Sequence, residues 1–444
     1  MPKTVLFVTY GGGHAQMVTP VIRELEGRSD IRVEAIALTT AGPIFKRERI
    51  PYKGFKHFIR PDDRDAIRWG KKLAGTHHNP EGGIEEDESI AYLGLSYWDL
   101  VVRFGKAEAA RLWETRERHA FLPLTVMERI IGQIKPDLVV TTNSPRSECA
   151  AIQVAKGRRI PTLSMVDLFG LGHFYPLEAD YITVLCNRVI ENLEQETHRP
   201  RASYLITGNP AFDHALDYDG PIDYAWRRQH FPKVPEVAKT LLWIDIPAHR
   251  NLQKNEILLR DDHEVVRDLN TLATAAQRND CMLLVRPHPS QRRGLYHEWL
   301  KTAPQHVMYA GDVPLYPLLN AVDLVCTYTS TVSIEALLMR RRVVQLKYLP
   351  GKSGLPLDEW KMAWIAKSPD EVSECIHDAL TDDAEWERMK GRIEEMLPQE
   401  KAAPKIAAHI ERILGCGQQT IAYTASQRPL APNSSPNHLI TLNF

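Results

Sequence analysis

The sequence predicts an α/β protein made of two doubly wound, Rossmann-like domains in tandem. Three observations support this fold class. Short β-rich runs alternate with longer amphipathic stretches, which is the pattern of βαβ units around a parallel sheet. This pattern restarts after residue 210, and the chain of 444 residues is long enough to form two hydrophobic cores.

The positions of the apolar runs give the expected elements. In the first domain we expect strands at 4–9, 33–38, 137–141 and 162–166 and helices at 20–26, 124–133 and 148–156. In the second we expect strands at 240–246, 281–289, 323–328 and 341–346, each followed by a polar loop and a helix. These loops therefore lie at the carboxyl edge of a sheet, where open α/β proteins bind ligands.

Composition shifts give the expected boundaries. The predicted order is a first domain at 1–210, a proline-bearing linker at 211–238, a second domain at 239–383, helices at 384–414 and a tail at 415–444. The helices at 384–414 could cross back to the first domain. Segment 56–100 is polar and glycine-bearing, which indicates a surface insertion that could also touch a substrate. The tail, rich in Ser, Pro and Asn, is predicted to be disordered.

Charge and cysteine usage narrow the class of protein. The formal net charge of -1 argues against a nucleic-acid binder that works by bulk electrostatics. The six cysteines are scattered without a CxxC pair, which suits a reducing compartment and disfavours a zinc site. The first apolar run is too short for a signal peptide or a membrane span, so we expect a cytoplasmic protein, with peripheral contact at the inner face of the membrane as an option.

The first candidate motif is the glycine loop in "TYGGGHAQM". Gly12 and Gly13 let backbone amides approach a ligand, and the helix that follows favours an anion. The loop lacks the GxGxxG spacing of a dinucleotide site, and the glycines could also be simple turn formers. His14 stands beside them at the end of the first strand and is a candidate catalytic residue.

Two further loops of the first domain carry polar residues. Ser144 in "TTNSPRS" most simply caps a helix that opens on Pro145. Asp167 ends the next strand, in "SMVDLFG", where its carboxylate can face the same cleft as His14. The segment "DYD" at 217–219 carries too little information to predict a metal site, and we expect no metal or other cofactor.

In the second domain, two loops deliver a histidine and an arginine each. "LLWIDIPAHRN" supplies His249 and Arg250, and "LLVRPHPSQRR" supplies Arg286 and His288. Guanidinium groups bind phosphate bidentately, so the pairing predicts a phosphate site. A solvated basic edge is the alternative.

The stretch "DLVCTYTSTVSIEALL" places hydroxyl groups at a strand-to-helix junction. Thr329, Ser330 and Thr331, together with the amides that open the helix, could cradle a diphosphate. Glu335 lies one turn further and could accept hydrogen bonds from a ribose diol. A helix cap is the alternative, although a cap requires only one hydroxyl.

These motifs resemble those of a known family. "TGNPAFD", "RPHPS" and "TSTVSIEALLMRRRVVQL", in this order, resemble the C-terminal half of GT-B glycosyltransferases that build bacterial surface polysaccharide, and "GGGHAQMVTPVIREL" resembles their N-terminal glycine loop. The chain is also similar to the non-hydrolysing UDP-N-acetylglucosamine 2-epimerase. It departs from the epimerase pattern where one acid becomes Asp167 and another is replaced by Asn143 or Ser144.

The resemblance implies two domains facing a central cleft and a metal-independent transfer of a sugar from a UDP- or CMP-sugar to a glycan or lipid-linked acceptor. The residues implied for the nucleotide sugar are Gly12, Gly13, His249, Arg250, Arg286, His288, Thr329, Ser330, Thr331 and Glu335. The acceptor would bind the first domain, where His14 or Asp167 takes its proton. The alternatives are a nucleotide-sugar 2-epimerase or hydrolase, and a binding subunit without catalysis.

Overall fold

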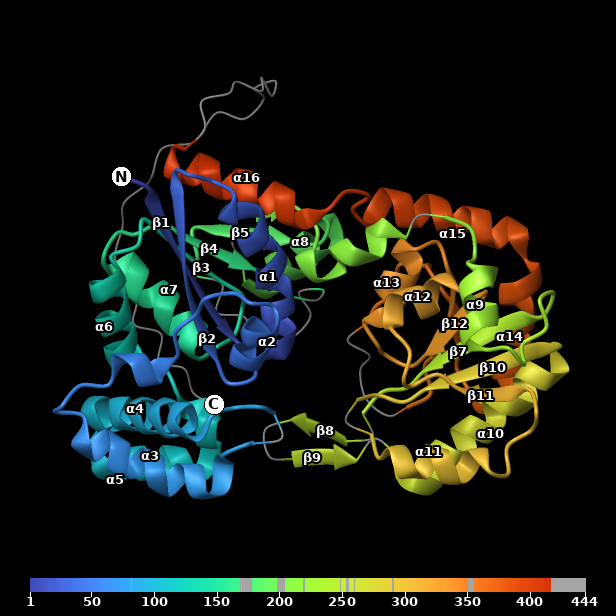
Figure 1. The fold of residues 1–444 in the computed structure, drawn as a ribbon, viewed down its shortest axis with the longest axis horizontal. Helices are drawn as coiled ribbons and strands as arrows, with labels where there is room; N and C mark the ends of the chain where they lie inside the picture. The colour runs from blue at the N-terminus through green and yellow to red at the C-terminus, as the bar shows by residue number, and fades with distance from the viewer. Residues whose placement is uncertain are drawn as a thin grey trace.

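Two parallel six-stranded sheets organise the protein in a computed structural model (Figure 1). The first has the order β2-β1-β3-β4-β5-β6 and the second the order β11-β10-β7-β12-β13-β14. The α/β class of two doubly wound domains is thus confirmed. The strands are β1 (Lys3–Tyr10), β2 (Ile31–Leu38), β3 (Leu138–Thr141), β4 (Thr162–Met165), β5 (Tyr181–Val184), β6 (Tyr204–Ile206), β7 (Lys239–Ile244), β10 (Cys281–Arg286), β11 (Val307–Tyr309), β12 (Leu324–Thr327), β13 (Arg342–Leu346) and β14 (Trp364–Ala366), with β8 (His249–Leu252) and β9 (Asn255–Leu258) forming an antiparallel pair.

The structure describes residues 1–416 except 81, 168, 170–177, 198–203, 219, 248, 253–254, 259, 290 and 350–354, and it does not describe the side chains of 195–197, 249–252 and 255–258. The predicted tail lies outside the described residues from 417 onward. Helices cover the sheets as α1 (Gly12–Glu26), α2 (Ala41–Arg47), η1 (Phe55–Phe58), α3 (Arg64–His77), α4 (Glu86–Phe104), α5 (Lys106–Arg116), η2 (Glu117–Ala120), α6 (Leu124–Ile134), α7 (Ser147–Gly157), α8 (Asn187–Thr197), η4 (Pro210–Asp217), α9 (Tyr224–His230), α10 (Asp262–Arg278), α11 (Arg293–Leu300), α12 (Leu315–Asn320), α13 (Val332–Leu338), η5 (Pro369–Glu371), α14 (Val372–Thr381), α15 (Asp383–Met396) and α16 (Ala402–Leu414).

The first helix begins earlier than predicted. The prediction placed this helix at 20–26, with its start at Pro20. In the structure Pro20 lies inside α1, and the helix begins at Gly12. The buried side chains of Ala15, Met17 and Val18 stabilise the additional turns by packing on the sheet, and this packing outweighs the backbone hydrogen bond that proline removes.

The strand order reverses at one place in each sheet. In the first sheet the chain passes from β1 outward to β2 and then returns to β3 on the other side of β1; in the second, β7 is flanked in the same way by β10 and β12. Ligands of doubly wound sheets bind at such reversal points, beyond the carboxyl ends of the strands. The fold therefore points to the loops after β1 and β3 in one lobe and after β7 and β12 in the other.

The segment at 56–100 forms a helical hairpin of α3 and α4, and the prediction of a surface insertion is wrong for its second half. Helix α4 buries Tyr92, Leu93 and Leu100 in the core of the first lobe. Helices α3 and α4 approach so closely that a Cβ added at Gly70 would lie 2.1 Å from the carbonyl oxygen of Ile90. The polar composition misled because most charged residues of the pair are exposed, and the two charged residues that α4 buries are Glu88 and Asp99.

The end of the described chain crosses back to the first lobe. Helix α15 lies over the second lobe, whereas α16 lies across the first and packs on α1 (Figure 1). Its residues Ala403, Ile406 and Ile410 are buried in the same core as β1. Asp213 of η4 fixes the start of α16, since its two carboxylate oxygens accept hydrogen bonds from the amides of Ala402 (2.6 Å) and Ala403 (2.8 Å).

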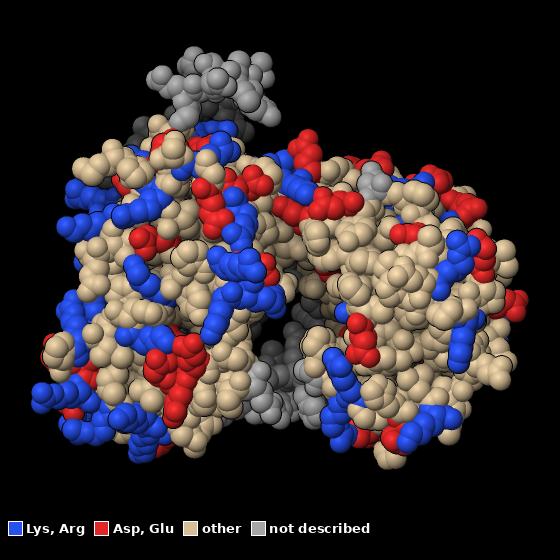
Figure 2. Space-filling view, viewed as in Figure 1, with Lys and Arg blue, Asp and Glu red and all other residues tan. Residues whose placement is uncertain are grey.

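The surface carries both signs of charge. Figure 2 shows acidic and basic side chains interspersed on one face, with the surface hollowed between the two lobes. Within the described part of the chain, no helix has both the length and the apolar character that a membrane crossing requires.

A buried ion pair joins the linker to the second sheet. Asp323, at the start of β12, accepts hydrogen bonds from Arg227 of α9 (3.1 Å) and from Lys239 (3.0 Å). The Arg227 side chain is 2% exposed and the Lys239 side chain 56% exposed. Arg227 also donates to the carbonyl oxygens of residues 236 and 238, so it holds the chain that leads into β7.

We expect Arg227→Met to lower the free energy of unfolding by about 3–5 kcal/mol, because it strips a buried carboxylate of its buried partner. Lys239→Met removes the exposed partner of the same carboxylate and should cost less than about 1 kcal/mol. Chemical denaturation of both variants measures the difference. Equal losses would show that the buried and the exposed partner contribute alike.

Candidate active site in the first lobe and nucleotide site in the second

A pocket of about 440 Å³ opens at the reversal point of the first sheet. It is lined by residues 10–14 after β1, residues 143–146 after β3, and Asp167 after β4. The register explains why these loops meet: Val8 of β1 lies opposite Thr141 of β3, which lies opposite Ser164 of β4. Sequence positions up to 157 residues apart (10 to 167) thus share one cavity.

The glycine segment forms the first turn of α1 and not a separate loop. Gly11 has φ +89°, a conformation that side chains with a Cβ rarely adopt, and it turns the chain from β1 directly into the helix. The first intrahelical hydrogen bond runs from the amide of Ala15 to the carbonyl of Gly11. The amides of Gly12, Gly13 and His14 precede it and so belong to the unpaired N-terminal donors that favour anionic groups.

The buried carboxylate of Glu148 organises this pocket. Its Oε1 accepts a hydrogen bond from the amide of Tyr10 (2.7 Å) and lies 3.3 Å from Nδ1 of His14. Its Oε2 accepts from the hydroxyl of Thr142 (2.5 Å) and the amide of Ser144 (2.9 Å). The Glu148 side chain is fully buried, so it positions the other groups and offers no surface to a ligand.

Asp167 faces His14 from the other side. Its Oδ2 lies 3.3 Å from Nε2 of His14, while its Oδ1 accepts a hydrogen bond of 3.0 Å from the Asn143 side chain. Asn143 also accepts a hydrogen bond from the amide of Asp167 at 3.0 Å, which fixes the two residues against each other. The Asp167 side chain is 24% exposed, so this carboxylate can contact a ligand in the pocket.

The two carboxylates change the protonation of His14. Burial lowers the pKa of His14, but the charge of Glu148 and the hydrogen bonds that His14 donates to both carboxylates outweigh burial and raise it to about 10. His14 is therefore an imidazolium at neutral pH. A protonated histidine donates hydrogen bonds and cannot take a proton from an acceptor.

One sequence-based expectation is corrected here, and one residue was missed. Ser144 was predicted to cap α7, but α7 begins at Ser147 without a side-chain cap, and Ser144 lines the pocket instead. The sequence analysis did not single out Glu148, on the first turn of α7, as a residue of this site. The signal was present, because a carboxylate on the first turn of a helix after a strand is the same feature that singled out Glu335.

The second lobe brings its loops to one edge as well. Arg286 of β10, Ile244 of β7 and Thr327 of β12 stand in one row across the sheet. The side chain of Gln291 donates to the carbonyl of Ile246 at 2.9 Å and so ties the loop after β10 to the loop after β7. The loops predicted to hold a nucleotide thus emerge side by side.

At the strand-to-helix junction the hydroxyl groups divide into two sets. Thr329 is exposed, and Ser330 and Thr331 are half-buried at the start of α13. Thr327 instead donates to the carbonyl of Ile244 within the sheet. The hydroxyl of Tyr328 is also directed into the core, which leaves three hydroxyl side chains at the edge.

Tyr328 belongs to a buried ionic network. Its hydroxyl donates to Asp268 at 2.7 Å, and Arg260 pairs with both Asp268 and Asp245. Tyr296 adds a second hydroxyl, bound to Asp245. Because Asp245 directly follows β7, this network fixes the loop at the reversal point of the second sheet.

Glu335 lies one turn into α13 and is 8% exposed. Its Oε1 accepts a hydrogen bond of 2.6 Å from the hydroxyl of Tyr316, whose ring stacks on Tyr218 at 5.9 Å. Burial raises the pKa of Glu335 to about 7, against the opposing effect of the Tyr316 hydrogen bond. A ribose diol at this position would compete with Tyr316 or bind beside it.

The histidine and arginine candidates differ in availability. Arg286 is half-buried and uses Nη1 to bind the carbonyl oxygens of Ala310 and Val313, at 3.0 and 2.7 Å. Burial lowers the pKa of His288 below its usual value, so it would offer a neutral hydrogen-bond donor to a phosphate. The side chains of His249 and Arg250 lie outside the described part of the structure, which places only their backbone, in β8.

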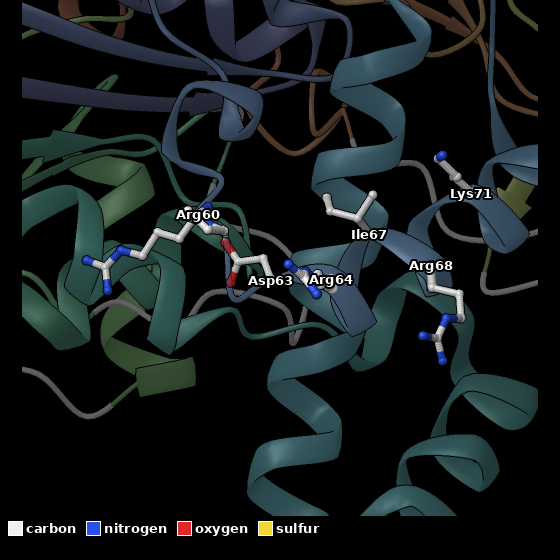
Figure 3. Close-up of a pocket in the computed structure, with 7 residues that line it drawn as sticks. Arg60, Asp63, Arg64, Ile67, Arg68 and Lys71 are labelled. Atoms are coloured by element: carbon white, nitrogen blue, oxygen red, sulfur yellow. Dashed lines mark hydrogen bonds between the residues drawn. The ribbon is translucent and has the colours of Figure 1, made fainter.

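A different hollow lies at the start of α3. It is lined by Arg60, Arg64, Arg68 and Lys71, with Asp63 neutralised by Arg129. The labelled basic side chains point in different directions and do not converge on one point (Figure 3). This arrangement lacks the convergent polar groups of a ligand site. Among the residues that the structure describes, no group of His, Cys, Asp and Glu has the arrangement of a metal site.

Comparisons with known proteins agree with this architecture. Residues 261–348, which include β10, β12 and α13, match the family described as capsule polysaccharide biosynthesis protein. A search of curated protein sequences finds no significant match. Among solved structures, the UDP-GlcNAc 2-epimerase of Neisseria meningitidis bound to UDP-GlcNAc is similar, with a TM-score of 0.58, 13% identity and coverage of 92% of this chain and 100% of that chain.

Two other solved structures show the range of similar proteins. The UDP-GlcNAc 2-epimerase of Methanocaldococcus jannaschii has a TM-score of 0.57 at 12% identity, covering 92% of this chain and 99% of that chain. The glycotransferase of kitacinnamycin has a TM-score of 0.56 at 14% identity, covering 93% and 100%. The chain therefore has the GT-B fold that transferases and epimerases share, and at these identities the likeness is one of fold.

The pKa of His14 makes stability depend on pH. The folded-state pKa, about 10, exceeds the unfolded value of 6.5, so the stabilisation is complete below pH 6.5 and is lost as the pH rises from 6.5 to about 10. We expect Glu148→Gln to lower the pKa of His14 and to flatten this decline. Denaturation across that pH range, with NMR titration of the His14 ring, measures both effects. Glu128→Gln, which removes an exposed partner of Arg158, is the control, and an unchanged His14 titration in Glu148→Gln would contradict the assignment.

Proposed function

We propose that the protein is a glycosyltransferase that moves a sugar from a UDP- or CMP-sugar to a glycan or lipid-linked acceptor in the biosynthesis of bacterial surface polysaccharide. It would act in the cytoplasm or at the inner face of the membrane, without a metal. The observation that carries the proposal is the cluster of Glu148, His14 and Asp167, which places one accessible carboxylate in a pocket at the reversal point of the first lobe. The match of residues 261–348 to capsule polysaccharide biosynthesis proteins supports the cellular role.

The second lobe would bind the nucleotide sugar. The amides at the start of α13, with Ser330 and Thr331, offer hydrogen bonds to phosphate oxygens. Arg286 ends β10, on the other side of β7 from β12, and His288 lies on the loop that follows β10. Glu335 would bind the ribose. These groups stabilise the negative charge that develops on the leaving phosphate when the bond to the anomeric carbon breaks.

Asp167 would act as the general base. The acceptor hydroxyl attacks the anomeric carbon, a new carbon–oxygen bond forms, the bond to the phosphate breaks, and the acceptor proton passes to Asp167. His14 remains an imidazolium throughout. It orients Asp167 through the contact at Nε2, while Glu148 balances its charge from the buried side.

A 2-epimerase or hydrolase is the second candidate, and one observation favours it: two carboxylates, Glu148 and Asp167, flank His14 at this pocket, and acid–base chemistry at C2 requires two such groups. The burial of Glu148 weighs against this reading, because all four of its contacts are to protein groups and its side chain has no exposed surface. Of these two carboxylates, Asp167 alone is then left to touch a sugar. Loss of donor without any acceptor would favour the epimerase or hydrolase.

The first test is a thermal-shift screen with UDP, CMP, GDP and their common sugar conjugates, since a ligand that binds only the folded state raises its stability. We expect UDP or CMP to raise the unfolding temperature of the wild type.

Glu335→Ala should weaken the binding of that nucleotide about tenfold or more, because the variant loses a charged acceptor for the ribose. Tyr316→Phe is the matched control, because it removes the hydrogen bond to Glu335 and keeps the carboxylate. Wild-type affinity in Glu335→Ala would refute the ribose assignment.

Asp167→Asn should lower kcat by about 10²–10⁴-fold, the usual contribution of a general base, while nucleotide affinity stays unchanged. The amide retains the size of the side chain and its contact with Asn143 but cannot accept the proton. Single-turnover kinetics with a radiolabelled sugar donor measure the chemical step. A variant that transfers sugar at the wild-type rate would remove Asp167 from the catalytic role.

A further inference from the structure

A second pocket, of about 200 Å³, adjoins the His14 pocket. Tyr10 and Gly11 line both pockets and form the wall between them. Helix α4 contributes Tyr92 to the second pocket, and η2 contributes Arg118. The two cavities therefore run from the catalytic groups toward the helical insertion.

Two arginines along this path lack acidic partners. Arg146 lines the first pocket and Arg118 the second, and neither forms an ion pair or a side-chain hydrogen bond with any residue that the structure describes. The Nε atom of Arg146 is buried and unpaired among these residues. The guanidinium lies over the ring of Tyr10, 4.3 Å from its centre, and that ring packs against Tyr92 at 5.7 Å.

The positive potential of these arginines is not cancelled locally. Burial lowers the pKa of His119, and the charges of Arg146 and Arg118 lower it further, with Glu117 as the opposing acid. Glu88 also lines the second pocket, but burial raises its pKa to about 7, and its oxygens accept hydrogen bonds from two backbone amides. The carboxylates of Glu148 and Asp167, at the first pocket, both contact the ring of His14.

We propose that the acceptor carries an anionic group, a carboxylate or a phosphate, that binds between Arg146 and Arg118 while Tyr10 and Tyr92 flank the sugar that bears it. The inference rests on the proposed function in taking this pocket as the acceptor site. Guanidinium groups bind both anions through paired hydrogen bonds, and aromatic rings suit the apolar faces of sugars. The bound anionic group thus holds the acceptor in place, so that the hydroxyl of the acceptor reaches Asp167.

The test compares methyl glucoside, methyl glucuronide and glucose 6-phosphate as probes of the full chain by ligand-detected NMR, with inorganic phosphate as a fourth. We expect at least one anionic sugar to bind about tenfold tighter than methyl glucoside, the magnitude of one charge-assisted contact. Tighter binding of methyl glucuronide alone would indicate an acceptor with an acidic sugar. Tighter binding of glucose 6-phosphate alone would indicate a phosphorylated acceptor. Equal binding of neutral and anionic sugars, or inorganic phosphate binding as tightly as glucose 6-phosphate, would overturn the proposal.

Variants locate the site. Arg146→Gln and Arg118→Gln should abolish the preference for the anion, and Arg146→Lys should retain part of it. Arg64→Gln is the control, because Arg64 lines the divergent hollow at the start of α3. Unchanged preference in Arg146→Gln would refute the site. Turnover of the nucleotide sugar, measured on the wild type and on the same variants, separates the two proposals. Anion binding without turnover would refute the transferase, whereas turnover without a preference for the anion would refute only the subsite.

Discussion

The carboxylate of Glu148 is the constraint on which the candidate active site depends. It accepts hydrogen bonds from the end of β1 and from the loop after β3, and it pairs with His14 at the start of α1. Three chain segments are thus fixed to one point inside the lobe. Because the groups around it are amides, a hydroxyl and an imidazolium, the charge is compensated without water, and the pocket keeps its shape before any ligand arrives.

Both lobes use the same device, with different results. In each, a glutamate on the first turn of a helix after a central strand turns toward the carboxyl edge of the sheet. Glu148 meets several donors and is closed to ligands, whereas Glu335 meets the hydroxyl of Tyr316 and has a pKa near 7. The first residue supports its neighbours, and the second is suited to exchange its partner for a ligand hydroxyl. The same structural motif thus gives a rigid site in the first lobe and an adaptable site in the second.

The sequence was sufficient for the fold and for the loops that form the sites, since alternating apolar runs and polar strand ends follow from simple periodicity. It was not sufficient for the start of α1, because the helix begins at Gly12, before Pro20, where Ala15 and Met17 pack in the core. The sequence also does not show in which direction a side chain points. Thr327 and Tyr328 directly precede the hydroxyl residues 329–331, yet they bind Ile244 and Asp268 in the core. The role of Glu148 depends on four contacts that only the structure shows. Likewise, only the structure shows that Arg146 and Arg118 have no acidic partner among the described residues.

The return of α16 to the first lobe has a consequence for biosynthesis on the ribosome. The second lobe has all its strands by Ala366, and its sheet can close while translation continues. The first lobe is made earlier but lacks Ile406 and Ile410, which pack in its core beside β1, until α16 emerges. The apolar surface that α16 covers in the first lobe is therefore exposed during most of synthesis. A premature stop between α15 and α16 would therefore damage the lobe that is encoded first.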